Sequence, residues 1–407
     1  MQKLLVIITL VALAAGAVSQ VGHDSAQAQD SDRGAVVAGN TAFAFDLYQT
    51  LRSEEGNLFF SPYSIAAALA MTYGGARGDT EAAMADTLHF TLEQAALHPA
   101  FSNLRAYMPG GEGEQDFRLR IANRLWGQTG YGFLPEYVDL LNANYDAGLQ
   151  ELDFAADPDT ARLTINDWVA GETEQRIPEF FPPDSNAINQ GTRLVLTNAI
   201  YFQAAWFFPF DESDTSDDTF SRLDGSPVTV PFMRQTELLG YLAGDGYQVV
   251  VLPYANHQAR MVIIVPDVGT FEAFESALDP ALLESIRTGV IVHNVTLAMP
   301  RWAYTSDFDL VEALIELGMG VACSPGADFS GMTGTSDLFI SAVIHQAEVA
   351  VDEAGTEASA ATAVILAPSG APQDPVILTL DRPFIYLIMD NNTDSVLFMG
   401  RVLDPSQ

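Results

Sequence analysis

The chain has 407 residues, 48% of them hydrophobic, and a formal net charge of −35 from 18 basic and 53 acidic residues. So acidic a surface repels nucleic acid, heparin-like polyanions and anionic membranes, and we expect none of them as partners. The acidic surface either is an adaptation to a high-salt habitat or simply keeps the protein soluble. The single cysteine, Cys323, excludes an intramolecular disulfide, so stability must come from core packing.

Residues 1–28 predict a secretory signal peptide. Lys3 supplies the positive charge, and the apolar run over 4–18 is too short for a membrane span. Cleavage after Ala28 fits the small-residue pattern best, and cleavage after Ser19 is the alternative. Residues 29–36 are small and polar and predict a disordered leader. We therefore expect a soluble monomer that is secreted or periplasmic.

Helices and strands alternate along the rest of the chain. Apolar residues at helical spacing predict a helix over 40–52, and residues 57–60 predict a short strand entering a helix capped by Ser61 with Pro62 in its first turn. Further helices are predicted over 160–181 and 307–318. Strands are predicted over 194–202, 248–266 (two strands), 290–300, 376–380, 384–389 and 395–402. With no internal repeat or long linker, residues 37–404 predict one mixed α+β domain.

The segment 353–366 has an unusual pattern. At the two-residue period of a strand, the even positions from Thr356 to Leu366 are small and then apolar, whereas the odd positions begin with the charged Glu357. Proline-rich turn residues follow at 368–375. An alanine-rich helix or a flexible linker is the alternative, since alanine favours helices. The pattern favours a strand-competent segment attached to an exposed loop.

Six separated stretches resemble, in the right order, signatures of the serpin family. They are 57–65 (NLFFSPYSI), 165–169 (INDWV), 197–202 (TNAIYF), 327–332 (ADFSGM), 382–384 (RPF) and 397–402 (LFMGRV). The resemblance covers about residues 37–404. It implies three β-sheets with about nine helices, a large central sheet A, and an exposed reactive loop at about 353–380.

The resemblance also implies a function and the residues that carry it. A serpin inhibits serine endopeptidases, or cysteine endopeptidases as alternative targets, by a suicide-substrate mechanism: the protease cuts the loop, and the loop then inserts into the main sheet. The implied hinge comprises Glu353, Gly355, Thr356, Glu357, Ala358, Ser359, Ala360, Ala361 and Thr362. The implied shutter, beneath the point where the sheet opens, comprises Ser61, Ser64, Asn198 and His345. The implied breach at the top of the sheet comprises Trp206, Arg301 and Glu353, with Arg301 and Glu353 paired.

The family's usual distance from Glu353 places the scissile bond between Ser369 and Gly370, with cleavage after Leu366 or Ala367 as the alternative. No arginine or lysine occurs between Gly355 and Asp381, which disfavours a trypsin-like target. The small residues before the cut favour a serine protease of elastase-like or subtilisin-like preference.

Two other function classes fit the sequence less well. An enzyme is disfavoured: Lys3 is the sole lysine, which excludes lysine chemistry in the mature chain, and no metal-ligand or nucleophile motif is present, so we expect no cofactor and no metal. A non-inhibitory serpin, acting as a binding, carrier or chaperone-like protein, is the alternative. Such members tend to carry bulky, charged or proline residues in the hinge, and the small residues of 358–363 favour an inhibitor.

Overall fold

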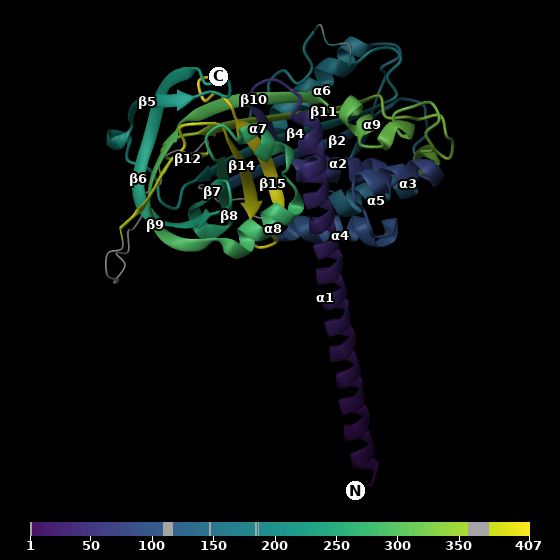
Figure 1. Ribbon diagram of the computed structural model, residues 1–407. Helices are drawn as coiled ribbons and strands as arrows, with labels where there is room; N and C mark the ends of the chain where they lie inside the picture. Colours follow the sequence, from purple (N-terminus) through teal and green to yellow (C-terminus); the bar gives the residue numbers. More distant parts are fainter. Residues whose placement is uncertain (1, 109–116, 146–147, 184, 186, 357–373) are drawn as a thin grey trace.

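The computed structural model describes residues 2–108, 117–145, 148–183, 185, 187–356 and 374–407, with side chains from Gln27 onward, Asn256 excepted. Its helices and strands are mixed along the chain (Figure 1), which confirms the α+β class. Within these ranges the α-helices are α1 (Gln2–Leu51), α2 (Pro62–Tyr73), α3 (Gly78–Thr87), α4 (Gln94–Tyr107), α5 (Pro135–Tyr145), α6 (Pro158–Glu172), α7 (Phe271–Ser276), α8 (Pro280–Gly289), α9 (Val311–Glu316) and α10 (Ser330–Thr333). Short 3-10 helices are η1 (Glu212–Asp214), η2 (Ala255–His257) and η3 (Met319–Val321).

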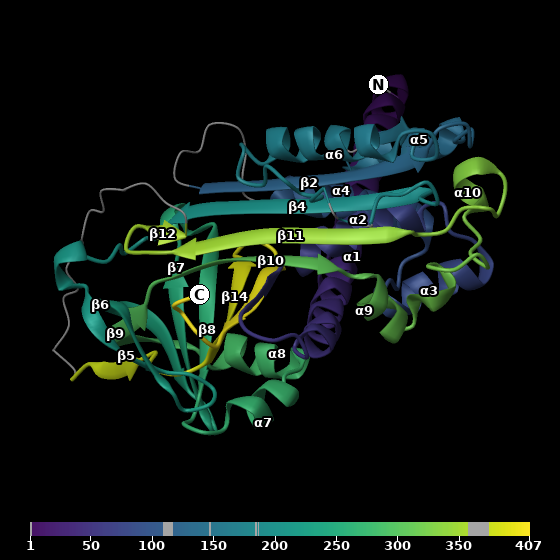
Figure 2. The ribbon, with the colours of Figure 1, turned by 90° about the horizontal axis from the view of Figure 1, so that it is seen from above.

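A six-stranded sheet forms the upper layer of the molecule. Its order is β10 (Trp302–Asp309), β11 (Ala342–Val351), β12 (Gly355–Thr356), β4 (Leu194–Ala205), β2 (Phe117–Gln128) and β3 (Leu149–Leu152). Figure 2 shows β2, β4, β11 and β10 side by side, with α6 along one face. Ile165 and Val169 of α6 pack there against Val195 and Ala199 of β4.

The second sheet has nine strands and lies under the other face of the first. Its order is β1 (Leu58–Phe60), β15 (Val396–Val402), β14 (Phe384–Asp390), β8 (Ala259–Pro266), β7 (Tyr247–Pro253), β6 (Pro227–Ala243), β9 (Ile291–Pro300) and β13 (Val376–Thr379), with β5 (Ser216–Ser221) paired to β6. Where three sheets were expected, the described strands form two. The reason is that β6 pairs with β7 near its end and with β9 along most of its length, which joins two layers into one sheet.

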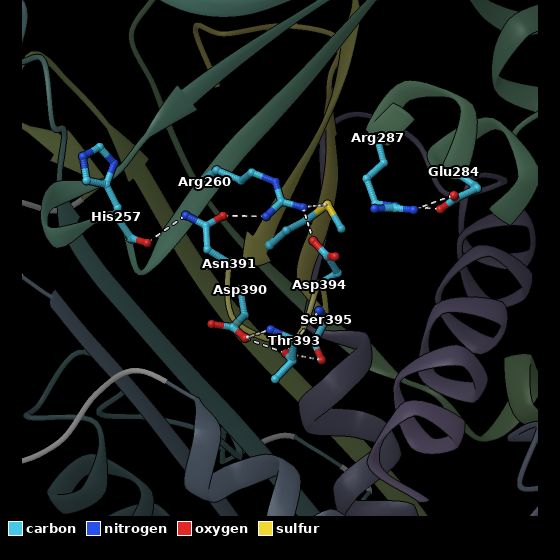
Figure 3. Close-up of polar contacts among 10 residues, drawn as sticks. His257, Arg260, Glu284, Arg287, Asp390, Asn391, Thr393, Asp394 and Ser395 are labelled. Atoms are coloured by element: carbon cyan, nitrogen blue, oxygen red, sulfur yellow. Dashed lines mark hydrogen bonds and ion pairs between the residues drawn. The ribbon is translucent and has the colours of Figure 1, made fainter. Parts of the chain in front are cut away.

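The hairpin between β14 and β15 is held at its tip by polar contacts (Figure 3). Arg260 of β8 donates to Asn391 at 2.5 Å and pairs with Asp394 at 2.6 Å. The backbone N–H of Thr393 donates to the buried carboxylate of Asp390. Both strands of this hairpin are buried along their whole length, so the tip fixes a central part of the core.

The helix α1 corrects one expectation. It runs through residues 29–36, where a disordered leader was predicted. Arg33 donates to Asn103 of α4 at 3.1 Å and its guanidinium lies over the Tyr107 ring, while Val36 is buried. The polar composition of 29–36 therefore marks the outer side of a helix docked on α4. Among the described residues, no helix combines the length and apolarity needed to cross a membrane.

Most element predictions are confirmed, including the Ser61 cap, whose side chain accepts the N–H of Ser64. Three helix predictions have wrong limits, and one of them is the helix predicted over 40–52, which forms only the last part of α1 (Gln2–Leu51). The helix predicted over 160–181 ends at Glu172, because Glu174 and Gln175 adopt positive φ angles that turn the chain away. The helix predicted over 307–318 begins only at Val311, because Asp307 and Asp309 belong to strand β10.

Candidate functional site

The six-stranded sheet contains a line along which two strands are only partly joined. We call this line, between β4 and β11, the seam. The two strands are parallel and pair directly from Val195 and Ala342 to Ile200 and Ala347. Beyond that point they diverge, and β12 enters between them (Figure 2), with Thr356 paired to Ala204 on one side and Val351 on the other. The seam is thus closed over one half and open at the other.

The four predicted shutter residues meet beneath the closed half. The backbone N–H of Ser61, at the start of α2, donates to Nε2 of His345 on β11 at 3.1 Å. The other ring nitrogen, Nδ1, contacts the amide oxygen of Asn198 on β4. The amide nitrogen of Asn198 donates to Oγ of Ser64 at 2.6 Å. These contacts make a chain that runs from β11 through β4 to α2.

The protonation state of His345 follows from its partners. Nε2 accepts a hydrogen bond, so Nδ1 carries the proton and donates it to Asn198. The ring is fully buried, and burial lowers the pKa of His345 to about 3. The ring is therefore neutral at ordinary pH, and each nitrogen has a partner, as a buried polar group requires.

Asn123 of β2 belongs to the same cluster and was not predicted. Its amide oxygen accepts from Asn198 and from Oγ of Ser64, and its amide nitrogen donates to the carbonyl of Ser64 at 3.1 Å. The one sequence signal that could have found it is an amide side chain set among the apolar residues around Ala122. Through Asn123, strand β2 is tied to β4 and α2.

The breach residues meet at the open end of the seam. Glu353 is buried, and its Oε1 accepts from Nε and Nη2 of Arg301 at 2.8 and 2.5 Å. The expected pair is present, with both donors on one oxygen. Thr215, which was not predicted, donates to the same oxygen at 2.5 Å. Burial raises the pKa of Glu353, but the hydrogen bonds from Arg301 and Thr215 outweigh it and hold the pKa below its usual value.

Trp206 joins this pair to the first hinge residues. Its indole Nε1 donates to the carbonyl of Asp352 at 3.0 Å, and its backbone N–H donates to the carbonyl of Ala354 at 2.9 Å. The indole stacks on the ring of Tyr254 with centroids 4.6 Å apart. The hydroxyl of Tyr254, another residue that was not predicted, lies 2.7 Å from that of Thr356.

Two of the predicted hinge residues that follow Glu353 in the chain, Gly355 and Thr356, lie in the six-stranded sheet, where they form β12. The other loop predictions lie outside the described residues: Glu357, Ala358, Ser359, Ala360, Ala361, Thr362, Leu366, Ala367, Ser369 and Gly370.

Comparisons with known proteins agree with this architecture. The family model described as Serpin (serine protease inhibitor) matches residues 38–405. An uncharacterized serpin-like protein of Thermococcus kodakarensis is 38% identical over 372 residues, covering 91% of this chain and 86% of that protein. The leukocyte elastase inhibitor of Bos taurus is 38% identical over 380 residues, covering 90% of this chain and 99% of that protein. The solved structure of human thyroxine-binding globulin with its ligand is 28% identical, with a TM-score of 0.82, covering 93% of this chain and 100% of that one.

Proposed function

Because the chain belongs to the serpin family, we propose that it inhibits serine endopeptidases as a suicide substrate, and that its cleaved loop inserts into the seam as a new strand. The observation that carries this proposal is the position of Gly355 and Thr356. They already lie between β4 and β11 and are hydrogen-bonded into the sheet. Insertion would extend a strand that has begun, and stored strain is released by such loop insertion in general.

The register of β12 defines where each later residue would go. Since β12 is antiparallel to both neighbours, each step forward in the loop is a step back in β4 and β11. Thr362 would then pair with Asn198 and His345, and Leu366 with Leu194 and Ser341. Leu194 is the first residue of β4, so the seam has room for the chain through Leu366.

The same register supports the two-faced pattern of the hinge. Thr356 is buried against Tyr254, on the side of the core between the two sheets. Even positions share that side because side chains alternate along a strand, and Glu357 falls on the opposite face. At about 0.8 kcal/mol per buried carbon group, the even side chains from Ala358 to Leu366 contribute roughly 9 kcal/mol on insertion. That gain is large against typical folding stabilities.

Insertion through Leu366 is compatible with all three proposed cuts. Cleavage after Leu366 or Ala367 gives a segment that just fills the seam, and cleavage between Ser369 and Gly370 leaves a short extension. We propose a protease of elastase-like or subtilisin-like preference, since arginine and lysine are absent between Gly355 and Asp381. The name of the similar Bos taurus protein, leukocyte elastase inhibitor, supports the elastase-like choice.

We also propose that the protein is secreted after cleavage behind Ala28. Residues 27–30 are exposed, and the first buried side chain of α1 described is Val36. Removal of residues 1–28 would therefore keep the Arg33–Asn103 contact and the packing of α1. The mass of the protein recovered from outside the producing cells tests this cut directly.

The experiment for the main proposal is incubation with a panel of elastase-like, subtilisin-like and trypsin-like proteases. We expect an SDS-stable complex with the first two classes, and the mass of the released peptide identifies the cut. Cleavage anywhere in 366–370 should also raise the melting temperature sharply. An unchanged melting temperature after such a cut would exclude insertion. That result would favour a binding or carrier role, an alternative supported by the similarity to thyroxine-binding globulin.

A further inference from the structure

A cavity of about 130 Å³ lies between strand β2 and the helices α2, α4, α5 and α6. Its apolar lining includes Ala67 of α2 and Ile121 of β2, and its polar lining includes two arginines, Arg105 of α4 and Arg124 of β2. Arg105 and Glu172, which also lines the cavity, are exposed and mark its opening to solvent. An engineered protein cavity of roughly 150 Å³ holds benzene, so this cavity has room for one small molecule.

Arg124 is a binding group with unused capacity. Its guanidinium carbon lies 4.3 Å from the ring centroid of Trp168 on α6 and 5.4 Å from that of Trp126, and this stacking orients the planar group. Nη1 donates to Gln150 at 3.2 Å, which is the one hydrogen bond of this side chain among the described residues. Because a guanidinium carries five N–H donors, Arg124 can still make the two parallel hydrogen bonds that a carboxylate accepts.

The lining is rich in hydrogen-bond donors that lack an acceptor. Nε of Arg124 and Nε1 of Trp168 are buried, and neither has a partner in the described structure. Asn123, which also lines the cavity, donates one of its two amide N–H groups to the carbonyl of Ser64. Unpaired donors cost free energy when they are kept from water, so this lining favours a ligand with acceptor oxygens.

The charge around the cavity is positive, although the whole chain carries −35. Arg105 and Arg124 supply two positive charges and Glu172 one negative charge, which leaves one positive charge in excess. The tyrosines of the lining do not offset it. Burial raises the pKa of Tyr63 to about 12 against the opposing effect of Arg105, and burial raises the pKa of Tyr145 as well, so both are neutral at ordinary pH. An anion is therefore attracted to this cavity and a metal cation is repelled.

We propose that this cavity binds a small organic monocarboxylate, with its oxygens at the guanidinium of Arg124 and its apolar body against Ala67 and Ile121. An inorganic anion would leave the apolar walls unused, and a neutral apolar molecule would leave the N–H donors unpaired. A second carboxylate on the ligand would meet the negative charge of Glu172 at the opening. A carboxylate attached to one aryl or short alkyl group uses every feature of the site.

The site is separate from the loop and from the breach. Asn123 is its one link to the shutter, and no residue of the hinge described in the structure lines it. A ligand that binds the folded protein and not the unfolded chain stabilises the fold in proportion to its occupancy. The melting temperature should therefore rise with the concentration of carboxylate, whether or not the protein inhibits a protease.

Binding is measured by calorimetric titration of the intact protein with benzoate, at an ionic strength held constant with sodium chloride. Benzoate should bind saturably with one site per chain. Benzamide, which has nearly the same shape and no charge, should bind at least tenfold more weakly. The absence of saturable benzoate binding, or equal affinity for benzoate and benzamide, overturns the site.

Two variants locate the binding at this cavity. Arg124→Gln should lose at least tenfold in affinity for benzoate. The control Arg120→Gln removes an arginine of the same strand that lies outside the cavity, 3.8 Å from Glu174, and should stay within twofold of the wild type. Equal affinities in these two variants overturn the site. If Arg124→Gln does not fold, Ala67→Leu keeps both arginines and extends a larger side chain into the cavity. It should abolish benzoate binding and the rise of melting temperature with benzoate, and unaltered binding in Ala67→Leu overturns the site.

Discussion

The hydroxyl groups of Thr356 and Tyr254 lie 2.7 Å apart beneath the open end of the six-stranded sheet, and both residues are buried. The contact ties the first part of the hinge to the core between the sheets. It also means that the sheet has already accepted one inward-facing hinge side chain. The hinge is therefore sensitive to any residue at 356 that cannot be buried.

The substitution Thr356→Arg should convert the inhibitor into a substrate. A guanidinium group at 356 would have to enter a space occupied by Tyr254, without a counter-charge, and burying an unpaired charge is very unfavourable. The loop should then be cut and released without trapping the protease. The measurement is the ratio of cleaved protein to SDS-stable complex with an elastase-like enzyme. Thr356→Ser keeps the hydroxyl and is the control. If Thr356→Arg still traps the protease as efficiently as the control, the hinge mechanism is wrong.

A matched pair of variants tests the register of insertion. Ala358→Glu places a carboxylate on the inward side, whereas Ser359→Glu places the same group on the outward side, one residue away. We expect Ala358→Glu to reduce the complex fraction at least tenfold and Ser359→Glu to change it less than twofold. The reverse ranking would show that the loop enters with the opposite face inward.

Removal of Arg301 tests the breach. In Arg301→Ala, the buried Glu353 keeps Thr215 as a side-chain donor and loses the charged one, so the native state should lose about 1–3 kcal/mol of unfolding free energy. The pKa of Glu353 should rise, because the burial that raises it is no longer outweighed. Denaturant unfolding measures the first effect. As a control, Arg287→Ala breaks the exposed pair with Glu284 on α8 (Figure 3) and should cost much less. Equal losses in the two variants would argue against a special role for the pair at the breach.

The buried histidines predict how stability depends on pH. Burial lowers the pKa of His345 to about 3, and burial together with the charge of Arg77 lowers that of His98 to about 4. In the unfolded chain both titrate near 6.5. Between these values the unfolded state binds more protons, so the unfolding free energy falls as the pH drops below about 6.5. The contribution is complete above that pH.

The variant His345→Gln isolates the part of this pH dependence that is due to the shutter histidine. Each histidine contributes a slope of up to about 1.4 kcal/mol per pH unit between pH 4 and 6. His345→Gln should remove the slope contributed by one histidine, whatever the substitution does to absolute stability. The measurement is the unfolding free energy as a function of pH. A wild-type slope in His345→Gln would mean that His345 is not held neutral in the native state.

The sequence allowed the α+β class and many element positions to be predicted, because periodicity and caps are local signals. Ser61, Ser64, Asn198 and His345 lie far apart in the chain, and only the family resemblance suggested that they meet. Asn123 joins the site through its pairing with Asn198, and Tyr254 through its bridge to Trp206. Thr215 joins it through the packing of the turn before β5 against Glu353. One sequence contains neither the pairing nor the packing. The leader at 29–36 was misjudged for the same reason, since its packing partner α4 lies about 70 residues away.

The start of α2 contacts both sides of the seam. Ser61 donates to His345 on β11, and Ser64 accepts from Asn198 on β4, so each strand has its own anchor on the same turn of helix. The proposed insertion would separate the strands and break the hydrogen bond between His345 and Asn198, but each side chain would keep a polar neighbour on α2. The first turn of α2 can thus serve as a pivot common to the shut and the parted sheet. Substitutions in that turn should change the stability of the shut and the parted sheet together. A variant that weakens only one of the two forms should instead be a substitution on β4 or β11.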